Sequence, residues 1–378
     1  MKKALRAQNP FHFGQVVEDD AYCSRTALEK RLRSRIMRGQ NTVVLGNRRV
    51  GKTSLIWNVA ARRRGWKVWY VDFLGIKSGE DFLSRGIQAL VGLESQASVL
   101  NRVLKALPRI SVSVSPDPVT GLPSLTPSIA PNTFQPDNIT GLLKIVSDSA
   151  AKRRFVVIFD EFQDVCTIPD CGALLAVLRG RIQFMGDIPF VFAGSVRNDM
   201  WRLFADERSP MYKSADFIEV GSSDFDDFPG FLEARFRSGG KKVTGELLKE
   251  ALQICDSVPG DVQQMCAALW DSSRGEKVTH DDIGPALEEI FQNEERSYEL
   301  IVTELSAQQL KVLAVLARKG GESVLGKEFV SATGITHTSS VKRALTRLCQ
   351  RRLVFRSSRE YRFSNPFLRL WLMHKGYS

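Results

Sequence analysis

Over the first 221 residues, short apolar runs alternate with segments in which apolar residues recur at helical spacing. Five runs rich in Val, Ile, Phe and Trp have the length and composition of strands, and they lie at 41–46, 66–73, 154–160, 188–195 and 215–221. The helical segments between them lie at 53–62, 79–92, 138–151 and 171–185. Such alternation is typical of a mostly parallel sheet with helices on both faces. We therefore predict a three-layer α/β core.

Residues 108–136 interrupt this alternation. The segment holds seven prolines and many Ser and Thr residues, and its apolar and polar positions alternate on either side of Thr120 and Gly121. Alternation around a turn signal predicts two strands joined by a turn. We predict a protruding hairpin or a mobile loop inserted into the core, with a disordered surface insert as the alternative.

After Gly221 the strand signals stop. The pattern is helical from about 224 to 304, with breaks at Gly239-Gly240 and at Pro259-Gly260. A segment of this length with no strand predicts a small all-α lid.

A different order of elements begins at Ser306. Three helical segments, at 305–319, 326–332 and 339–352, precede two short strands within 353–364. Helix, helix, helix and hairpin is the order of elements in a winged helix-turn-helix. The predicted domains are an α/β core at 1–222, an all-α lid at 223–304 and a winged helix-turn-helix at 305–378.

The first strand leads into a phosphate-binding pattern. Residues 46–53 fit G-x-x-x-x-G-K-[ST] and open a helical segment. The glycines let backbone N–H groups point at a triphosphate, Lys52 reaches the β and γ phosphates, and Thr53 presents its hydroxyl to Mg²⁺. The residues expected to bind ATP are Gly46, Asn47, Arg48, Arg49, Val50, Gly51, Lys52, Thr53 and Ser54.

The third apolar run ends in two carboxylates, Asp160 and Glu161. We expect Asp160 to hold Mg²⁺, directly or through water, together with Thr53. Glu161 is expected to polarise the water that attacks the γ-phosphate, which is a general-base role. An apolar strand that ends in Asp-Glu is common, so the assignment depends on the phosphate-binding loop that precedes it.

Two further residues are candidates for the same site. Ser195 follows the fourth apolar run, at the end of a strand where open α/β sheets keep ligand groups. It either contacts the γ-phosphate or the attacking water, or it caps the following helix. Arg25 precedes a helical start and lies either near the nucleotide or in solvent.

These motifs resemble, in order and spacing, the archaeal-type P-loop ATPases of the AAA+/STAND group. The resemblance is carried by Asn9-Pro10-Phe11, Ser24-Arg25, Gly46 to Ser54, Asp160-Glu161-Phe162-Gln163-Asp164, Gly194-Ser195 and Ser209-Pro210-Met211-Tyr212. It implies a P-loop core, a helical lid and a C-terminal winged helix, with ATP and Mg²⁺ as cofactors. By this resemblance Asp160 ligates Mg²⁺, Glu161 is catalytic and Ser195 is the sensor 1 residue.

The sequence departs from that group at two points. Its lid helix opens with Pro259-Gly260-Asp261-Val262-Gln263, which contains no γ-phosphate-sensing arginine and has Val262 where STAND proteins usually have proline. The arginine finger is also unassigned, and Arg197, Arg208 and Lys213 are its candidates. Because a finger contributes about 10³–10⁵ in rate, we expect slow hydrolysis without a partner or self-assembly.

The composition excludes several other classes of protein. No apolar run approaches the roughly 18–20 residues that span a bilayer, and no hydrophobic stretch follows the basic start of the chain. The six cysteines form no C-x-x-C pair, and the four histidines lack metal-ligand or triad spacing. We therefore expect a cytoplasmic protein with reduced thiols and no membrane partner.

The net charge of +11 is unevenly distributed. Residues 306–378 hold 14 Lys and Arg and 3 Asp and Glu, and residues 1–66 hold 15 and 4, whereas residues 67–305 hold 24 and 35. Basic ends with an acidic middle suggest a polyanion partner for the ends. On the predicted winged helix, the candidate contacts to duplex DNA are Lys342, Arg343, Arg347, Arg351, Arg352 and Arg359.

Two functions fit these features. The first is an ATP-binding and hydrolysing switch, expected to form homo-oligomers, in which the nucleotide state sets the angle between core and lid and so positions the winged helix on DNA. The second is an ATP-dependent signalling or defence scaffold whose winged helix docks a protein partner. A nucleotide-binding protein without hydrolysis remains a third alternative, because the lid arginine is missing.

Overall fold

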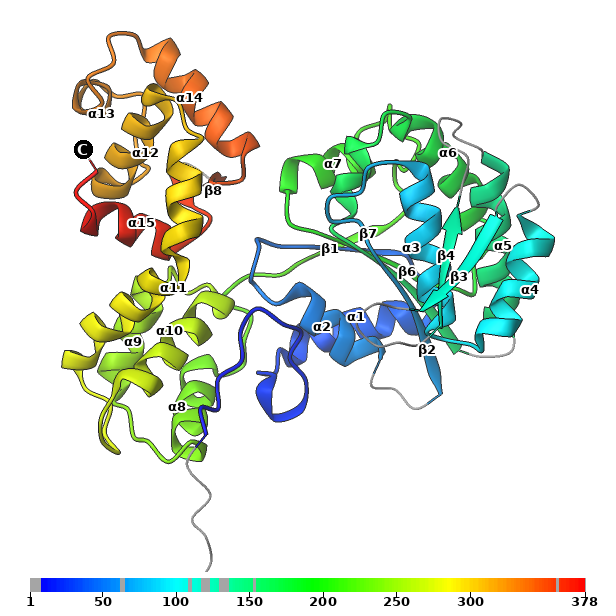
Figure 1. The fold of residues 1–378 in the computed structure, drawn as a ribbon, viewed down its shortest axis with the longest axis horizontal. Helices are drawn as coiled ribbons and strands as arrows, with labels where there is room; N and C mark the ends of the chain where they lie inside the picture. The colour runs from blue at the N-terminus through cyan, green and yellow to red at the C-terminus, as the bar shows by residue number, and fades with distance from the viewer. Residues whose placement is uncertain are drawn as a thin grey trace, which may run out of the picture. The chain divides into compact units, whose positions relative to one another are not determined.

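The computed structural model describes residues 8–61, 65–107, 111–116, 123–128, 136–151, 154–357 and 360–377. They form two compact units, one of residues 16–226 and one that combines the residues up to Gln15 with those from Asp227 onward (Figure 1). Among the described helices, none has the length and apolar character needed to cross a membrane.

A five-stranded parallel sheet forms the centre of the first unit. Its strands, in the spatial order β2-β5-β6-β1-β7, are β2 (Trp66–Asp72), β5 (Arg154–Asp160), β6 (Phe190–Gly194), β1 (Thr42–Leu45) and β7 (Asp216–Glu219). All five predicted strands are therefore confirmed. The order places β6 between the strand of the phosphate-binding motif and the strand that ends in Asp160.

Helices cover both faces of this sheet (Figure 1). One face packs Val44, Ile158 and Ile218 against α1 (Thr26–Met37) and α2 (Lys52–Ala60). The other face packs the alternate strand residues against α3 (Gly79–Val91), α4 (Gln96–Ala106), α5 (Pro136–Ala150), α6 (Cys171–Ile182) and α7 (Arg197–Ala205). Strand residues alternate between two apolar cores because successive side chains point to opposite faces. The predicted three-layer α/β fold is confirmed.

The proline-rich insert contains an antiparallel hairpin. Strand β3 (Ser111–Pro116) pairs with β4 (Pro123–Ser128). The predicted turn at Thr120 and Gly121 lies outside the described residues. The hairpin prediction is thus confirmed for its two strands.

The second unit begins with a group of helices. They are α8 (Phe228–Ser238), α9 (Gly245–Ile254), α10 (Pro259–Ser272) and α11 (Ile283–Thr303). The Asp227 carboxylate accepts the Gly230 N–H and the Thr244 hydroxyl accepts the Leu247 N–H, so side chains cap α8 and α9. These four helices confirm that the segment after the sheet is all-α, as predicted for the lid.

The N-terminal segment packs on this helical group, which the sequence patterns did not predict. The Phe11 ring meets the Phe236 ring of α8 edge-on with 4.6 Å between centroids. The Asn9 side-chain amide donates to the Ala267 carbonyl at 3.0 Å and to Asp271 at 2.7 Å. A ring contact and polar anchors therefore fix residues 9–11 on the lid.

The chain ends in a winged helix-turn-helix. Its helices are α12 (Ala307–Lys319), α13 (Lys327–Ala332) and α14 (Thr338–Gln350), and its hairpin consists of β8 (Val354–Ser357) and β9 (Glu360–Phe363). A capping box between Ser306 and Gln309 begins α12. A last helix, α15 (Pro366–His374), follows the hairpin. This order confirms the prediction for the C-terminal segment.

Candidate nucleotide and nucleic-acid sites

The predicted nucleotide residues meet at the carboxyl edge of the parallel sheet. Gly46 follows β1, Ser195 follows β6 and Asp160 ends β5. Because β6 pairs with both β1 and β5, these three chain segments lie next to one another. This edge is where open α/β sheets bind ligands.

The phosphate-binding loop has a backbone that depends on its glycines. Gly51, the residue before α2, has a φ of 87°, which glycine adopts without strain. A Cβ on Gly46 would lie 2.5 Å from the Val220 carbonyl oxygen, so only glycine fits where the loop leaves β1. No side chain caps the start of α2, and its first turn holds no acidic residue. The N-terminus of α2 therefore presents N–H groups and a positive dipole end to an anion.

The remaining loop residues differ in exposure. Arg48 is exposed, Asn47 and Arg49 are half-buried, and Val50 is buried. The Ser54 hydroxyl accepts the Val17 N–H at 3.2 Å, which ties the segment before α1 to the loop helix.

The Lys52 side chain folds back under the loop and reaches its second residue, Asn47. Its side chain is 5% exposed, and its Nζ donates to the Asn47 carbonyl at 3.1 Å and lies 3.9 Å from a Glu161 oxygen. Burial lowers the pKa of the Lys52 ammonium below its ordinary value, while the charges of Glu161 and Asp160 act in the opposite direction. The ammonium is thus a buried cation at the edge where a triphosphate would bring negative charge.

The Asp160 carboxylate accepts three hydrogen bonds. Thr53 Oγ1 donates to Oδ2 at 2.6 Å, Tyr70 OH donates to the same oxygen at 3.0 Å, and the Glu161 N–H donates to Oδ1 at 2.9 Å. The Thr53 hydroxyl and the Asp160 carboxylate therefore lie side by side at the start of α2. A hydroxyl beside a carboxylate is a donor set of the kind that Mg²⁺ takes next to phosphate oxygens, so these residues fit the expected metal.

Glu161 is held by two polar side chains. Its Oε2 accepts from Ser195 Oγ at 2.5 Å and from Gln163 Nε2 at 2.6 Å. The Ser195 N–H in turn donates to Gln163 Oε1 at 3.3 Å. Glu161 itself has a φ of 46°, an uncommon conformation for a residue with a side chain. Ser195 does not cap α7, because Val196 is the residue before that helix.

Arg25 is buried rather than solvated. Its side chain is 1% exposed, its guanidinium stacks over the Phe225 ring with 3.8 Å to the centroid, and Nη2 donates to the Val50 carbonyl. Its Nε and Nη1 have no hydrogen-bond partner among the described residues. Arg25 therefore supports the phosphate-binding loop through the Val50 carbonyl, and its Nε and Nη1 remain available as donors.

Two residues of this cluster were missed by sequence reasoning, Tyr70 and Gln163. Strand register carried a signal for Tyr70, since Asp72 of β2 lies opposite Asp160 and Tyr70 is two residues earlier on the same face. Gln163 lies within the quoted Asp-Glu-Phe-Gln-Asp motif, but its role as a link between Glu161 and Ser195 depends on their side-chain positions.

The candidate arginine fingers differ in their partners. Arg197 forms an ion pair with Glu219 at 2.8 Å and Arg208 forms one with Asp206 at 2.8 Å. Lys213 Nζ lies 4.9 Å from the centroid of the Tyr212 ring. Both arginines thus have carboxylate partners within their own unit.

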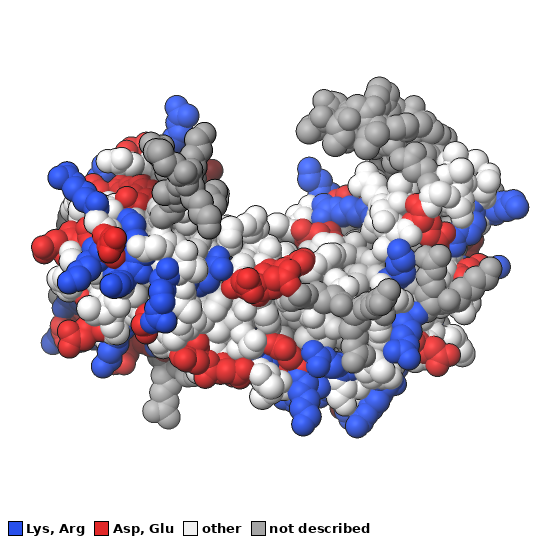
Figure 2. All heavy atoms as spheres, turned by 90° about the horizontal axis from the view of Figure 1, so that it is seen from below, with Lys and Arg blue, Asp and Glu red and all other residues white. Residues whose placement is uncertain are grey.

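The predicted DNA-contacting residues lie in the other unit. Lys342, Arg343 and Arg347 are exposed on α14, whereas Arg351 donates to both the carbonyl and the carboxylate of Glu304. The half-buried Arg352 has a φ of 57°, and Arg359 lies outside the described residues. In Figure 2, Lys and Arg side chains and Asp and Glu side chains are interspersed with uncharged residues on the visible face.

Comparison with solved structures matches the chain over nearly its whole length. The Walker-type ATPase PAby2304 of Pyrococcus abyssi is 18% identical with a TM-score of 0.66, over 96% of this chain and 99% of that one. The ORC2 protein of Aeropyrum pernix, in its ADPNP-ADP complexes, is 14% identical with a TM-score of 0.54, over 96% of each chain. The ORC1 protein of Aeropyrum pernix, in complex with DNA, is 16% identical with a TM-score of 0.52, over 95% of this chain and 94% of that one. The fold is that of a Walker-type ATPase.

Sequence comparisons add the C-terminal assignment. A family model described as "probable winged helix domain" matches residues 296–374. No curated protein sequence matches the chain. At the identities of the solved structures the similarity establishes the fold, and it agrees with the predicted resemblance to archaeal P-loop ATPases that carry a C-terminal winged helix.

Proposed function

We propose that this chain is an ATP-binding and hydrolysing switch of the AAA+/STAND type. In this proposal it acts in the cytoplasm, and its nucleotide state controls self-assembly and the engagement of duplex DNA by the winged helix. One observation carries the proposal: a continuous hydrogen-bonded network joins Thr53, Asp160, Glu161 and Ser195 beside the N-terminus of α2. These side chains come from the start of α2 and from the ends of β5 and β6, and they offer the metal-holding and water-orienting groups that phosphoryl transfer uses.

Each residue of the network has a distinct role in hydrolysis. The α2 N-terminus and Lys52 bind and neutralise the phosphates, and Thr53 and Asp160 hold Mg²⁺. Bound Mg²⁺ supplies positive charge to the phosphate oxygens. Glu161 accepts a proton from the water that attacks the γ-phosphorus as the bond to the ADP oxygen breaks. Ser195 and Gln163 fix the Glu161 carboxylate so that it faces this water.

The basic face of α14 supports the DNA-binding part of the proposal. Lys342, Arg343 and Arg347 are exposed on this helix, and Arg343 and Arg347 share a face because they are four residues apart. When folds of this kind bind DNA, their recognition helix lies in the major groove, and α14 occupies the position of that helix. The ORC1 structure with a similar fold is a complex with DNA.

The coupling is tested by the ATPase rate per subunit at increasing protein concentration, with and without duplex DNA. We expect the rate to rise with concentration, with duplex or with both, because the catalytic arginine comes from a neighbouring subunit. Lys52→Ala, which loses the buried phosphate-binding cation, is the background control. A rate per subunit that stays constant across all these conditions contradicts the switch.

A second candidate function is a scaffold whose winged helix docks a protein. It is favoured by two arginines at the end of α14 and in the β8–β9 hairpin (the wing), because Arg351 pairs with Glu304 and Arg362 pairs with Glu360. These acids lower the charge that the wing presents to phosphates. Duplex binding that is unchanged in Lys342→Ala/Arg343→Ala/Arg347→Ala supports this second function over the first.

A further inference from the structure

The excess of positive over negative residues in the ATPase unit lies mostly on one helix. Residues 16–226 hold 28 Lys and Arg and 23 Asp and Glu. Residues 26–38, which make up α1 and its C-cap, hold five Lys and Arg and a single acid, Glu29. Most of the surplus of the unit therefore lies on α1, and the nucleotide site does not use these five cations.

The five cations of α1 form no ion pairs within the part of the chain that the structure describes. Among the described residues, no Asp or Glu oxygen forms an ion pair with Lys30, Arg31, Arg33, Arg35 or Arg38. Some arginines elsewhere in the same unit are paired, as in Arg85 with Asp81 and Arg102 with Glu94. Unpaired like charges on one short helix repel one another, so this surface is suited to an external anion.

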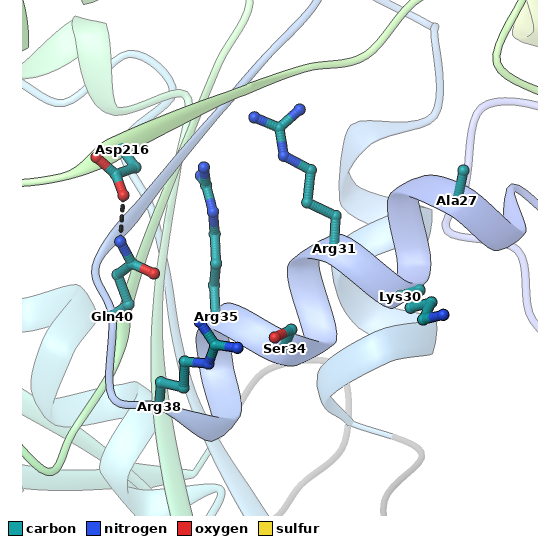
Figure 3. Close-up of a pocket in the computed structure, with 8 residues that line it drawn as sticks. All are labelled: Ala27, Lys30, Arg31, Ser34, Arg35, Arg38, Gln40 and Asp216. Carbon is teal, nitrogen blue, oxygen red and sulfur yellow. Dashed lines mark hydrogen bonds between the residues drawn. The ribbon is translucent and has the colours of Figure 1, made fainter.

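Several of these side chains line a hollow between α1 and the start of β7 (Figure 3). The hollow has a volume of about 480 Å³, and its lining residues are Ala27, Lys30, Arg31, Ser34, Arg35, Arg38, Gln40 and Asp216. In Figure 3, Arg31 and Arg35 extend from the same side of the helix. The only carboxylate among these lining residues, Asp216, accepts a hydrogen bond from the Gln40 amide.

Arg35 is incompletely satisfied. Its Nη1 is buried and has no hydrogen-bond partner among the described residues. Burial, and then the neighbouring Arg31 charge, lower the pKa of the Arg35 guanidinium, while Asp216 acts in the opposite direction. A buried donor with no acceptor is destabilising, and an anion in the hollow would supply the missing acceptor.

The hollow is separate from the nucleotide site. Gln40 precedes β1, and Asp216 is the first residue of β7. Both therefore lie at the amino ends of parallel strands, whereas Gly46 and Asp160 lie at the carboxyl ends. The ATP phosphates are thus not the anion that this hollow would bind.

We propose that the basic face of α1 binds the phosphate backbone of duplex DNA without reading its sequence. Arg31, Arg35 and Arg38 are four and three residues apart, so they are spaced about 6 Å and 4.5 Å along the helix axis. Arginine forks match phosphate oxygens in two-point contacts. Ser34, between Arg31 and Arg35 in sequence, adds a neutral donor.

The lining residues favour a duplex over two other partners, a single-stranded nucleic acid and a protein. They include no aromatic side chain, whereas single-strand sites stack bases on aromatic residues. They also include no large apolar side chain, whereas the centre of a protein interface is apolar. The proposal for α1 does not depend on the winged helix, and it holds even if that domain docks a protein.

The test compares two triple variants of the full chain. Arg31→Gln/Arg35→Gln/Arg38→Gln removes three charges from α1. Lys77→Gln/Lys105→Gln/Lys144→Gln removes three charges from exposed sites elsewhere in the same unit. Binding to a fluorescent 30-base-pair duplex is measured by anisotropy over a salt series. The slope of log affinity against log salt should become shallower by about 0.9 for each lost phosphate contact, thus by about 2–3 in the α1 variant and by much less in the control.

Further variants make the outcome decisive. Arg31→Gln/Arg38→Gln leaves half-buried Arg35 in place and should reduce the slope by about 2 without affecting the melting temperature. Adding the α1 changes to Lys342→Gln/Arg343→Gln/Arg347→Gln should remove binding that the winged-helix variant retains. The proposal is overturned if the α1 variants bind duplex like the lysine control, including the case in which only self-association changes. A loss confined to single-stranded DNA overturns it as well.

Discussion

At the scale of single residues, the proposed hydrolysis of ATP depends on the Glu161 carboxylate. Ser195 Oγ and Gln163 Nε2 both donate to one of its oxygens, and Lys52 Nζ lies 3.9 Å from the other. A carboxylate held by two donors has few orientations open to it. Its position relative to an attacking water is thus set in advance by Ser195, which follows β6, and by Gln163, in the segment after β5.

Removal of one of these donors should slow turnover more than it weakens binding. Ser195→Ala deletes the 2.5 Å bond to Glu161, and hydrogen bonds to charged groups contribute about 1.5–3 kcal/mol. We expect kcat to fall about 10- to 100-fold with little change in KM for ATP. Ser195→Thr keeps the hydroxyl and should restore most of the rate. An equal loss in both variants would contradict the hydrogen-bonding role.

Tyr70 should affect the Mg²⁺ requirement. Tyr70→Phe keeps the ring beside Trp57 but removes the donor to Asp160 Oδ2. Loss of a hydrogen bond to a ligating carboxylate weakens metal affinity about 10- to 100-fold. The Mg²⁺ concentration for half-maximal ATP turnover should therefore rise by at least about tenfold. Tyr212→Phe, which loses a bond to Glu207, is the matched control and should leave it unchanged.

Local motifs explain why much of this cluster could be predicted. The loop at 46–53 and the Asp160-Glu161 pair each consist of residues that are neighbours in sequence. Their residue types and spacing are therefore enough to predict them. Tyr70 comes from a different strand, and its contact requires the pairing of β2 with β5. The alternative of a solvated Arg25 was open because burial beneath Phe225 depends on tertiary packing.

At the scale of elements, the junction between β1 and its loop is the tightest constraint. Gly46→Ala would place a Cβ 2.5 Å from the Val220 carbonyl oxygen and 3.0 Å from a Val50 methyl carbon. We expect the free energy of unfolding to fall by about 1–3 kcal/mol, as for overpacked sites, together with a loss of ATP affinity.

A second glycine provides the control for that change. Gly180 lies within α6, and a Cβ there would meet nothing within 4 Å. Gly180→Ala should raise the free energy of unfolding by about 0.5–1 kcal/mol through helix propensity. Denaturant melts measure both variants. A Gly46→Ala protein as stable as its parent, with unchanged ATP affinity, would contradict the packing argument.

Sequence patterns identified the strands and most helices because each has a buried face with a clear period. They did not identify α4 or α15, or the packing of Phe11 on Phe236. They also left the strand order open, because alternating strands and helices fit several orders in a parallel sheet. The placement of β6 between β1 and β5 is therefore information that only the structure supplies.

At the scale of the whole molecule, basic charge gathers at two separate surfaces. One is the exposed face of α14 and the other is the face of α1. The acidic middle of the chain includes Asp160 and Glu161. The two basic surfaces lie in the two basic ends of the chain, for which a polyanion partner was predicted. Binding of a polyanion to each surface can be tested separately.

In the proposed function, Glu161 activates water at an ATP site built by the loop at 46–54. The most direct measurement is phosphate release at saturating ATP by the parent and by Glu161→Gln, with ATP affinity determined for both. Glu161→Gln should bind ATP as tightly as the parent and hydrolyse it about 10²- to 10⁴-fold more slowly, because general-base catalysis contributes that factor. Lys52→Ala should lose ATP binding itself. Hydrolysis by Glu161→Gln at the parental rate would contradict the account.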